Sequence, residues 1–527
     1  MVLAAACLLT AAQTQPVSTA ATTALRQIVE LGRLDDLRWP DFTDYRQHVK
    51  NFYEPAGYQP AWIRDGQATP QARSMIANLQ KADEKGLHSD DYDGPRWEAR
   101  LAELSSAPDI SDLRIGRVNP KHFKFGLDVE QKKYDLPSFV RERLLNASDG
   151  QAMLDGVEPP FAGYARTKAV LLHYFDLARH DDGEQLPVAA KTIAPGSPYP
   201  GMPRLIRLLR LLGDLPASAS VAADTNLYEG AVVDAVKHYQ LRHGFQADGR
   251  LGAQTVKSLN TPLGLRIRQL QLTLERWRWL PYGFQQPTIV VNIPEFRLRA
   301  VEPEKGSTLE MNVIVGKAYG HKTPLFADTM EYVVLRPYWN VPPSIQRSEI
   351  VRAIQKNRDY IAKKNFEVTT RSGQVITSGT ISDDVLEQLR KGTLTVRQKP
   401  GPANSLGLVK LIFPNSNNVY LHSTPAPELF SRSRRDFSHG CIRVEKPAEL
   451  TAWALRSNPG WDLQRVQQAM EKGKDNQQVN LVKPIPVLIL YGTAVAEEDG
   501  TVHFFDDIYG LDASLEKVLT KGYPYPG

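Results

Sequence analysis

The sequence predicts a multidomain α+β protein, and three observations predict this class. First, 527 residues are too many for one hydrophobic core, so several domains of ordinary size are expected. Second, apolar residues recur at helical spacing up to about residue 262 and alternate at strand spacing from residue 287 onwards. Third, a stretch rich in proline and glycine, 192–203, separates two helical regions. We therefore expect a mostly helical N-terminal half with a small helical unit, followed by a mainly β domain that contains a helical insertion.

The composition favours a soluble globular protein and gives no sign of a nucleic-acid partner. Hydrophobic residues make up 42% of the chain and charged residues 23%, which is typical of soluble domains. The net charge of +5 comes from 64 basic and 59 acidic residues, and the excess is spread along the chain. A nucleic-acid binder usually gathers its positive charge on one face, so we expect no such partner. A mild attraction to an anionic polymer stays open.

The first residues, 1–24, resemble a secretory leader. An apolar run extends from Val2 to about Ala12, and small residues follow it. The run is too short to span a bilayer, and it lacks the positively charged start that such leaders usually have. Either the start is placed too late or the leader is atypical. We expect an exported protein whose mature form keeps one cysteine, Cys441, since Cys7 lies within the leader.

Residues 25–200 are expected to form a helical scaffold without chemistry of its own. One helix is predicted after Thr69, a candidate N-cap that precedes Pro70, and Gly86 is a candidate stop signal. The apolar face of this helix consists of Ala72, Met75, Ile76, Leu79 and Ala82.

The next stretch, 201–262, predicts a compact helical unit. Its first helix places apolar residues on one face and stops at Gly244, an Asp248–Gly249 turn follows, and a second short helix ends at Asn260. This order of elements resembles the peptidoglycan-binding domain found on many cell-wall enzymes. A plain helical spacer would show most of the same core and turn residues.

The second half, 285–490, is expected to be mainly β. Alternating segments begin with "TIVVNIPEFRLRAV", and the alternation is broken by a helical insertion at about 344–400. Such an insertion is often a lid or a binding wall. A hairpin around Asp499–Gly500 is predicted in the C-terminal segment, 491–527.

The segment "SHGCIRV", 438–444, raises the question of what an isolated thiol does in an exported protein. A buried small hydrophobe, a metal ligand and a nucleophile are the candidates. A nucleophilic thiol needs a base, and His422 or His439 could supply one. The same two histidines and Cys441 are legitimate zinc ligands, but no fourth ligand has an obvious spacing, so we expect no metal. Gly440 leaves backbone amides open for an oxyanion, and Arg443 could bind a substrate carboxylate.

The pattern of His422, then Ser438, His439, Gly440, Cys441 and Arg443 about sixteen residues later, resembles the signature of the YkuD-type L,D-transpeptidases. The segments "GKAYGHKTPLF" and "RPYWNVPPSI" and the order of the units resemble the larger Gram-negative members of that family. Many members have glycine where this chain has Ser423.

This resemblance implies roles for the residues. Cys441 is expected to be the nucleophile, His422 the general base and acid, and His439 a supporting residue, with the amides of Gly440 and Cys441 around the oxyanion. The residues expected to bind substrate are Tyr420, Ser438, Tyr338 and Trp339, although the aromatic ones could equally be ordinary core residues.

The resemblance also implies a reaction. The thiolate would attack a diaminopimelate carbonyl in a tetrapeptide stem, release D-alanine, and pass the acyl group to a second stem as a 3→3 cross-link. Water as acceptor would make the protein an L,D-carboxypeptidase, and a vestigial site would leave a non-catalytic wall-binding scaffold. The implied partners are peptidoglycan stem peptides and other cell-wall enzymes. No cofactor is expected, and carbapenems are expected to inactivate the enzyme. We also expect a monomer located in the periplasm.

Overall fold

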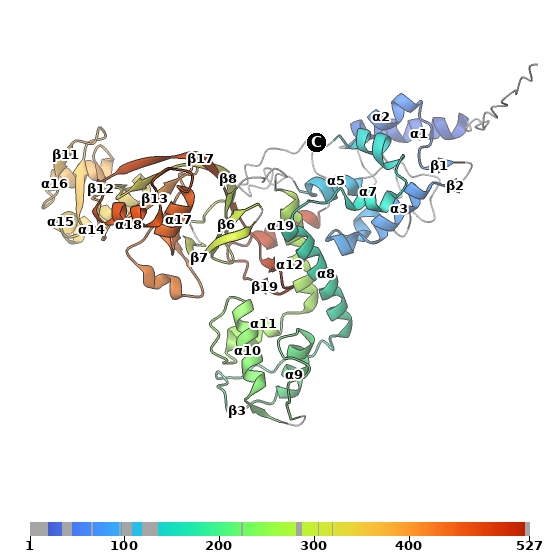
Figure 1. Cartoon of the computed structure of the whole chain (residues 1–527), viewed down its shortest axis with the longest axis horizontal. Helices are drawn as coiled ribbons and strands as arrows, with labels where there is room; N and C mark the ends of the chain where they lie inside the picture. The colour runs from blue at the N-terminus through green and yellow to red at the C-terminus, as the bar shows by residue number, and fades with distance from the viewer. Residues whose placement is uncertain are drawn as a thin grey trace, which may run out of the picture.

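A computed structural model of the chain shows three lobes that meet at a central pair of helices, α8 (Ala162–His180) and α12 (Leu263–Arg278) (Figure 1). The residues described by the structure are 19–33, 45–64, 67–93, 96, 108–118, 135–222, 225–280, 287–303, 305–318 and 320–521. Most of the expected leader, 1–24, lies outside them. In the described part of the chain, no helix combines the length and the apolar character that crossing a membrane requires.

The N-terminal lobe is helical, as expected. Its elements include α1 (Thr19–Leu31), α2 (Arg46–Tyr53), α3 (Pro70–Gln80), α5 (Pro108–Ile115), α6 (Leu136–Ser138) and α7 (Gly150–Asp155). Helix α3 begins where the sequence predicts, because Thr69 Oγ1 accepts a hydrogen bond from the Ala72 amide at 3.1 Å. A 3₁₀ turn continues the chain to Lys85, and Gly86 ends it with a φ of 76°.

The small helical unit also agrees with the prediction. It contains α9 (Met202–Leu211), α10 (Ala231–Arg242), α11 (Ala253–Leu259) and a two-stranded ribbon of β3 (Ser197–Pro198) and β4 (Leu227–Tyr228). The side chain of Gln240 fixes the turn between the last two helices, since it donates to Asp248 at 3.0 Å and accepts from the Gly249 amide at 2.8 Å.

The third lobe is built on a nine-stranded mixed sheet with the order β15-β7-β16-β14-β13-β8-β17-β5-β6. Its strands are β5 (Thr288–Asn292), β6 (Arg297–Glu302), β7 (Gly306–Gly316), β8 (Phe326–Leu335), β13 (Val409–Ile412), β14 (Leu421–His422), β15 (Asp436–Ser438), β16 (Ile442–Val444) and β17 (Gln477–Leu490). Helices α17 (Pro447–Ala454) and α18 (Leu463–Lys472) contribute to the hydrophobic core on one face of this sheet.

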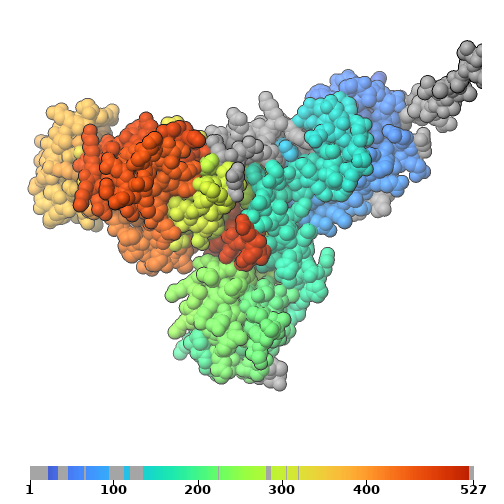
Figure 2. All heavy atoms as spheres, in the orientation of Figure 1, coloured from blue at the N-terminus to red at the C-terminus, as the bar shows by residue number. Residues whose placement is uncertain are grey.

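The insertion is only partly helical. Besides helices it contains a sheet with the order β11-β10-β12-β9, which the sequence did not predict. Its elements are β9 (Trp339–Asn340), α13 (Pro343–Ile345), η8 (Gln346–Ile350), α14 (Val351–Lys356), α15 (Tyr360–Lys363), β10 (Phe366–Thr369), β11 (Val375–Thr377), α16 (Asp383–Lys391) and β12 (Thr395–Gln398). These strands are two to four residues long, too short for a clear alternation of polar and apolar residues. The insertion has its own hydrophobic core and forms the outer end of the third lobe (Figure 2).

The C-terminal segment joins the three lobes, and Figure 2 shows it in red at their junction. The predicted hairpin is present as β18 (Ala494–Ala496) and β19 (Val502–Phe504), followed by α19 (Leu511–Leu519). The hairpin shares a hydrophobic core with α8 and α12.

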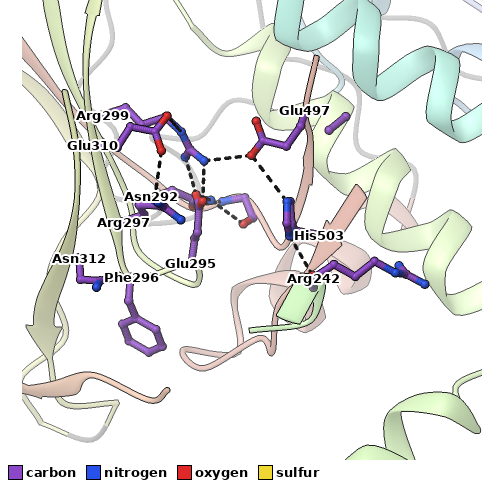
Figure 3. A network of polar contacts seen from close by, with 12 residues as sticks. Arg242, Asn292, Glu295, Phe296, Arg297, Arg299, Glu310, Asn312, Glu497 and His503 are labelled. Carbon is purple, nitrogen blue, oxygen red and sulfur yellow. Dashed lines mark hydrogen bonds and ion pairs between the residues drawn. The ribbon is translucent and has the colours of Figure 1, made fainter. Parts of the chain in front are cut away.

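A polar network also crosses this junction (Figure 3). Arg299 of β6 pairs with Glu295 through two contacts of 2.7 Å and with Glu497 at 3.1 Å. Glu497 lies 3.8 Å from His503 of β19, and His503 Nδ1 donates to the carbonyl of Arg242 in α10 at 3.0 Å. The sheet, the hairpin and the small helical unit are therefore linked by charged and polar side chains.

Glu275→Ala should lower the free energy of unfolding by about 3–5 kcal/mol, because it removes a carboxylate that is 2% exposed. Glu275 accepts from the amides of Arg117 at 2.7 Å and Val118 at 3.0 Å, and it pairs with the fully buried Arg278 at 3.5 Å. Thermal and urea unfolding would measure the loss. Glu387→Ala, at a half-exposed pair on α16, is the control and should change stability by less than about 1 kcal/mol. Equal melting temperatures for the two variants would contradict the prediction.

Candidate active site

The two motif segments of the sequence lie side by side in the sheet. Strand β14 pairs with β16 in parallel, with Leu421 opposite Ile442 and His422 opposite Arg443. Leu421 and Ile442 are fully buried in the core on one face of the sheet. Because side chains alternate along a strand, His422 and Arg443 lie on the opposite face.

The pairing extends one residue further towards the N-terminal ends of both strands, since the Ile442 amide donates to the Tyr420 carbonyl at 3.1 Å. Tyr420 therefore lies beside Cys441, and both share the face of His422 and Arg443. The rings of Tyr420 and His422 are 5.7 Å apart. Cys441 and His422 are diagonal neighbours on adjacent strands, a spacing within reach of side chains. These four residues form the site cluster.

A tight turn presents the cysteine. Gly440 has a φ of 118°, a conformation that favours glycine. Ser438 Oγ accepts from the Gly440 amide at 3.1 Å and donates to the Cys441 carbonyl at 2.5 Å. The Ser438 hydroxyl thus stabilises the turn, and its expected role in substrate binding stays a prediction. Since the Gly440 amide already has an acceptor, the Cys441 amide is the better candidate for the oxyanion.

Thr323, in the segment between β7 and β8, supports this turn. Its Oγ1 accepts from the Gly316 amide at 2.9 Å and donates to the Gly440 carbonyl at 2.8 Å. The Tyr509 hydroxyl accepts from the Thr323 amide at 3.1 Å and donates to the Gly316 carbonyl at 2.6 Å. A Cβ at Gly316 would lie 1.9 Å from the His321 carbonyl oxygen, so only glycine fits there. The C-terminal segment therefore contributes to the position of Cys441.

The His422 imidazole is buried and neutral. Its Nδ1–H donates to the Ser423 carbonyl at 2.6 Å, which leaves the lone pair on Nε2. Burial, and after it the positive charge of Arg443, lower the pKa of His422 to about 3, although the carbonyls of Ser423 and Leu406 oppose this shift. The ring can therefore accept a proton at neutral pH.

The Cys441 thiol is also neutral at rest. Burial raises its pKa, and the hydrogen bonds from Tyr420 and the charge of Arg443 only partly offset this effect. The thiol donates to the Asn418 carbonyl at 3.7 Å, and the hydrogen bonds of the described residues include none between Cys441 and His422. Catalytic hydrogen bonds are often long without substrate and tighten when it binds.

Alkylation of Cys441 by iodoacetamide should level off at a higher pH than that of an ordinary thiol, because only the thiolate reacts and burial raises the pKa of this thiol. An ordinary thiol, with a pKa of about 8.5, levels off earlier. Mass spectrometry of protein lacking residues 1–24 would follow the reaction, with glutathione as the reference thiol. A plateau by about pH 8 would mean that the thiol is instead held as a thiolate.

His439 connects the turn to the insertion. Its Nε2 contacts Glu349 Oε1 of η8 at 2.6 Å, and its ring centre lies 4.7 Å from that of His321. This contact fits the supporting role that the sequence predicts for His439. Its partner in the insertion could not be foreseen.

Tyr338 and Trp339 lie at the base of the insertion. The Arg397 guanidinium lies over the Tyr338 ring at 4.5 Å, and the Trp339 ring centre is 6.0 Å from that of Phe366. The contacts of the described residues do not join either aromatic to the site cluster, so their role in substrate binding stays a prediction. Within the described ranges, no group of three or more His, Cys, Asp or Glu side chains is placed to hold a metal ion.

Sequence reasoning missed three residues near the site. Thr323 lies within the "GKAYGHKTPLF" motif, but its contact with the turn depends on the fold. Lys410 interrupts the apolar run "LVKLIF", and this was a usable signal that one position of β13 faces away from the core. Nothing in the sequence around Tyr509 indicates that it supports the turn.

Three family models match the chain. They describe an L,D-transpeptidase catalytic domain over residues 286–480, a scaffold domain over 47–110 and a putative peptidoglycan binding domain over 204–259. A protein named "Putative L,D-transpeptidase" from Haemophilus influenzae is 30% identical over 291 residues, which is 54% of this chain and 58% of that protein. The chain thus matches little more than half the length of that relative.

Among solved structures, the crystal structure of an L,D-transpeptidase from Xylanimonas cellulosilytica DSM 15894 is matched at 15% identity, over 58% of this chain and all of that one. Its TM-score of 0.18 is too low to inform the fold. The match to the catalytic domain spans the signature from His422 to Arg443. Residues 286–480 therefore match the YkuD L,D-transpeptidase catalytic domain, and the regions before them match a scaffold domain and a putative peptidoglycan binding domain.

Proposed function

We propose that the protein forms 3→3 cross-links in peptidoglycan through a thioester on Cys441. One observation carries this proposal: a buried, neutral imidazole with its lone pair on Nε2 shares one face of two adjacent strands with a lone thiol. A base beside a protonated thiol is the arrangement that nucleophilic catalysis by cysteine needs.

In the first half-reaction, His422 Nε2 takes the thiol proton while Sγ attacks the carbonyl at the L-centre of diaminopimelate in the donor stem. The Cys441 amide donates to the developing oxyanion. The carbon–nitrogen bond to D-alanine then breaks, His422 returns its proton to the leaving amine, and a thioester remains on Cys441.

In the second half-reaction, the side-chain amine of a second stem attacks the thioester. His422 takes a proton from this amine and passes it to the departing sulfur, which restores the thiol and the neutral imidazole. The energy of the cleaved peptide bond is kept in the thioester, so the cycle requires no cofactor. A carbapenem would acylate the same thiol.

The remaining units suit work on the cell wall. A domain similar to peptidoglycan-binding domains would hold the enzyme on its polymeric substrate, and the expected leader would deliver it to the periplasm. The unit boundaries at 25–200, 201–262, 285–490 and 491–527 and the monomeric state stay predictions.

Protein lacking residues 1–24, incubated with disaccharide-tetrapeptide and followed by mass spectrometry, tests the proposal. A dimer that has lost one D-alanine is the expected product. Tripeptide monomer alone would replace the transpeptidase with an L,D-carboxypeptidase, for which water is the acceptor. If the protein binds peptidoglycan but yields neither product, it is a wall-binding scaffold.

A further inference from the structure

One lysine shares the face of the site cluster. Strand β13 pairs antiparallel with β14, and Lys410 lies directly opposite His422. Its neighbours along the strand, Val409 and Leu411, are fully buried in the core. Because side chains alternate, Lys410 projects to the same face as His422, and directly opposed residues have Cβ atoms about 5 Å apart.

Lys410 has no countercharge among the residues that the structure describes. Its side chain is half-buried, and the described residues provide it with neither an ion pair nor a hydrogen bond. Burial lowers the pKa of its ammonium group, because the partly buried charge has lost some of its contact with water. The charged side chain therefore destabilises the folded protein. The adjacent Arg443 also keeps a buried Nε without a hydrogen-bond partner among the described residues. Cations that lack partners beside a nucleophile indicate a site for an anion.

The order of the strands places Lys410 beyond His422 on the side away from Cys441. Arg443 lies on β16, which begins directly after Cys441, His422 lies on β14, and Lys410 lies on β13. Adjacent strands are about 4.8 Å apart. The acyl carbon binds at Cys441 and the leaving amine at His422. The carboxylate of the leaving amino acid is two bonds from that amine, on the side away from the thioester.

We propose that Lys410 binds the terminal carboxylate of the leaving D-amino acid and thereby selects donors that end one residue after the attacked carbonyl. This inference rests on the proposed function, because Lys410 would recognise the D-amino acid that the proposed reaction releases. A donor with one more residue would place a neutral peptide group at Lys410, so the lysine also favours tetrapeptide over pentapeptide stems.

The test compares Lys410→Met with the unchanged protein on two donors, disaccharide-tetrapeptide and the same compound ending in D-alanine amide. For the carboxylate donor, we expect kcat/KM to fall about 10- to 100-fold, mainly through KM, as one charge-assisted hydrogen bond would require. For the amide donor, kcat/KM should be equal in both proteins. Lys410→Arg should restore most of the preference for the carboxylate.

Two controls separate this role from a structural one. Lys356→Met, at an exposed lysine of α14, makes the same charge change and should leave both donors unaffected. The melting temperature of Lys410→Met should equal or exceed that of the unchanged protein, because the variant removes a half-buried charge without a partner. Equal losses on both donors, or no loss on either, would overturn the inference alone. An unchanged protein that releases no D-alanine from the tetrapeptide would overturn the proposed function and this inference with it.

Discussion

Cys441→Ala should abolish both cross-linked dimer and tripeptide, with a loss of activity on the order of 10⁴- to 10⁶-fold, as for the nucleophiles of other acyl-transfer enzymes. Alanine cannot form the thioester, and no other cysteine lies in the chain after residue 24. The variant should lose its activity but keep its fold. The hydrogen bond from the thiol to the Asn418 carbonyl is long, at 3.7 Å, so we expect the melting temperature to stay within a few degrees.

Intact-protein mass spectrometry gives a second reading of the same variant. The unchanged protein, mixed with tetrapeptide donor, should gain the mass of the donor less one D-alanine, and Cys441→Ala should gain nothing. Cys441→Ser is the matched control for shape, because a hydroxyl keeps a donor of similar size in the turn while it is a much poorer nucleophile at neutral pH. Dimer formation by Cys441→Ala at a rate near that of the unchanged protein would refute the assigned nucleophile.

The site could be predicted from the sequence only where its residues lie in one short motif. The hydrogen bonds of Ser438 within the "SHGC" turn join residues at most three positions apart, so the local sequence carries this part of the turn. The proximity of His422 and Cys441 depends on parallel pairing of two short strands, and the sequence indicated it only through a family resemblance. The apolar run that Lys410 interrupts indicates that this residue faces away from the core, but its place opposite His422 depends on strand register. The support from Tyr509 depends on a C-terminal contact that no local pattern encodes.

The fold was predictable to a similar depth. The α3 cap at Thr69 and the hairpin around Asp499–Gly500 follow from nearest neighbours, and both are present. The sheet within the insertion was missed, because strands of two to four residues are stabilised by pairing with distant segments rather than by their own periodicity. The resulting lobe holds Glu349 against His439, so the missed sheet bears directly on the site.

His422→Ala should lower kcat about 10²- to 10⁴-fold, the usual contribution of a general base and acid. Its buried ring is neutral above about pH 3, whereas the thiol it serves keeps a raised pKa. Acidification from pH 7 to about pH 5 should therefore not inactivate the unchanged enzyme through this base. In the variant the thiol must ionise unaided, so the residual rate should rise about tenfold per pH unit until the thiol is ionised. A pH–rate profile that both proteins share would contradict this role.

The comparison with His439→Ala decides which histidine is the base. His439 already uses Nε2 to contact Glu349, so its loss should affect the turn and the insertion and cost less activity than the loss of His422. Stability gives an independent reading. Below pH 6.5 the unfolded chain protonates His422 while the folded protein does not until about pH 3, so stability falls by up to about 1.4 kcal/mol per pH unit across that window. His422→Ala should flatten this acid slope, and His439→Ala should retain it. If His439→Ala instead gave the larger loss of kcat together with the flatter slope, the two assignments would have to be exchanged.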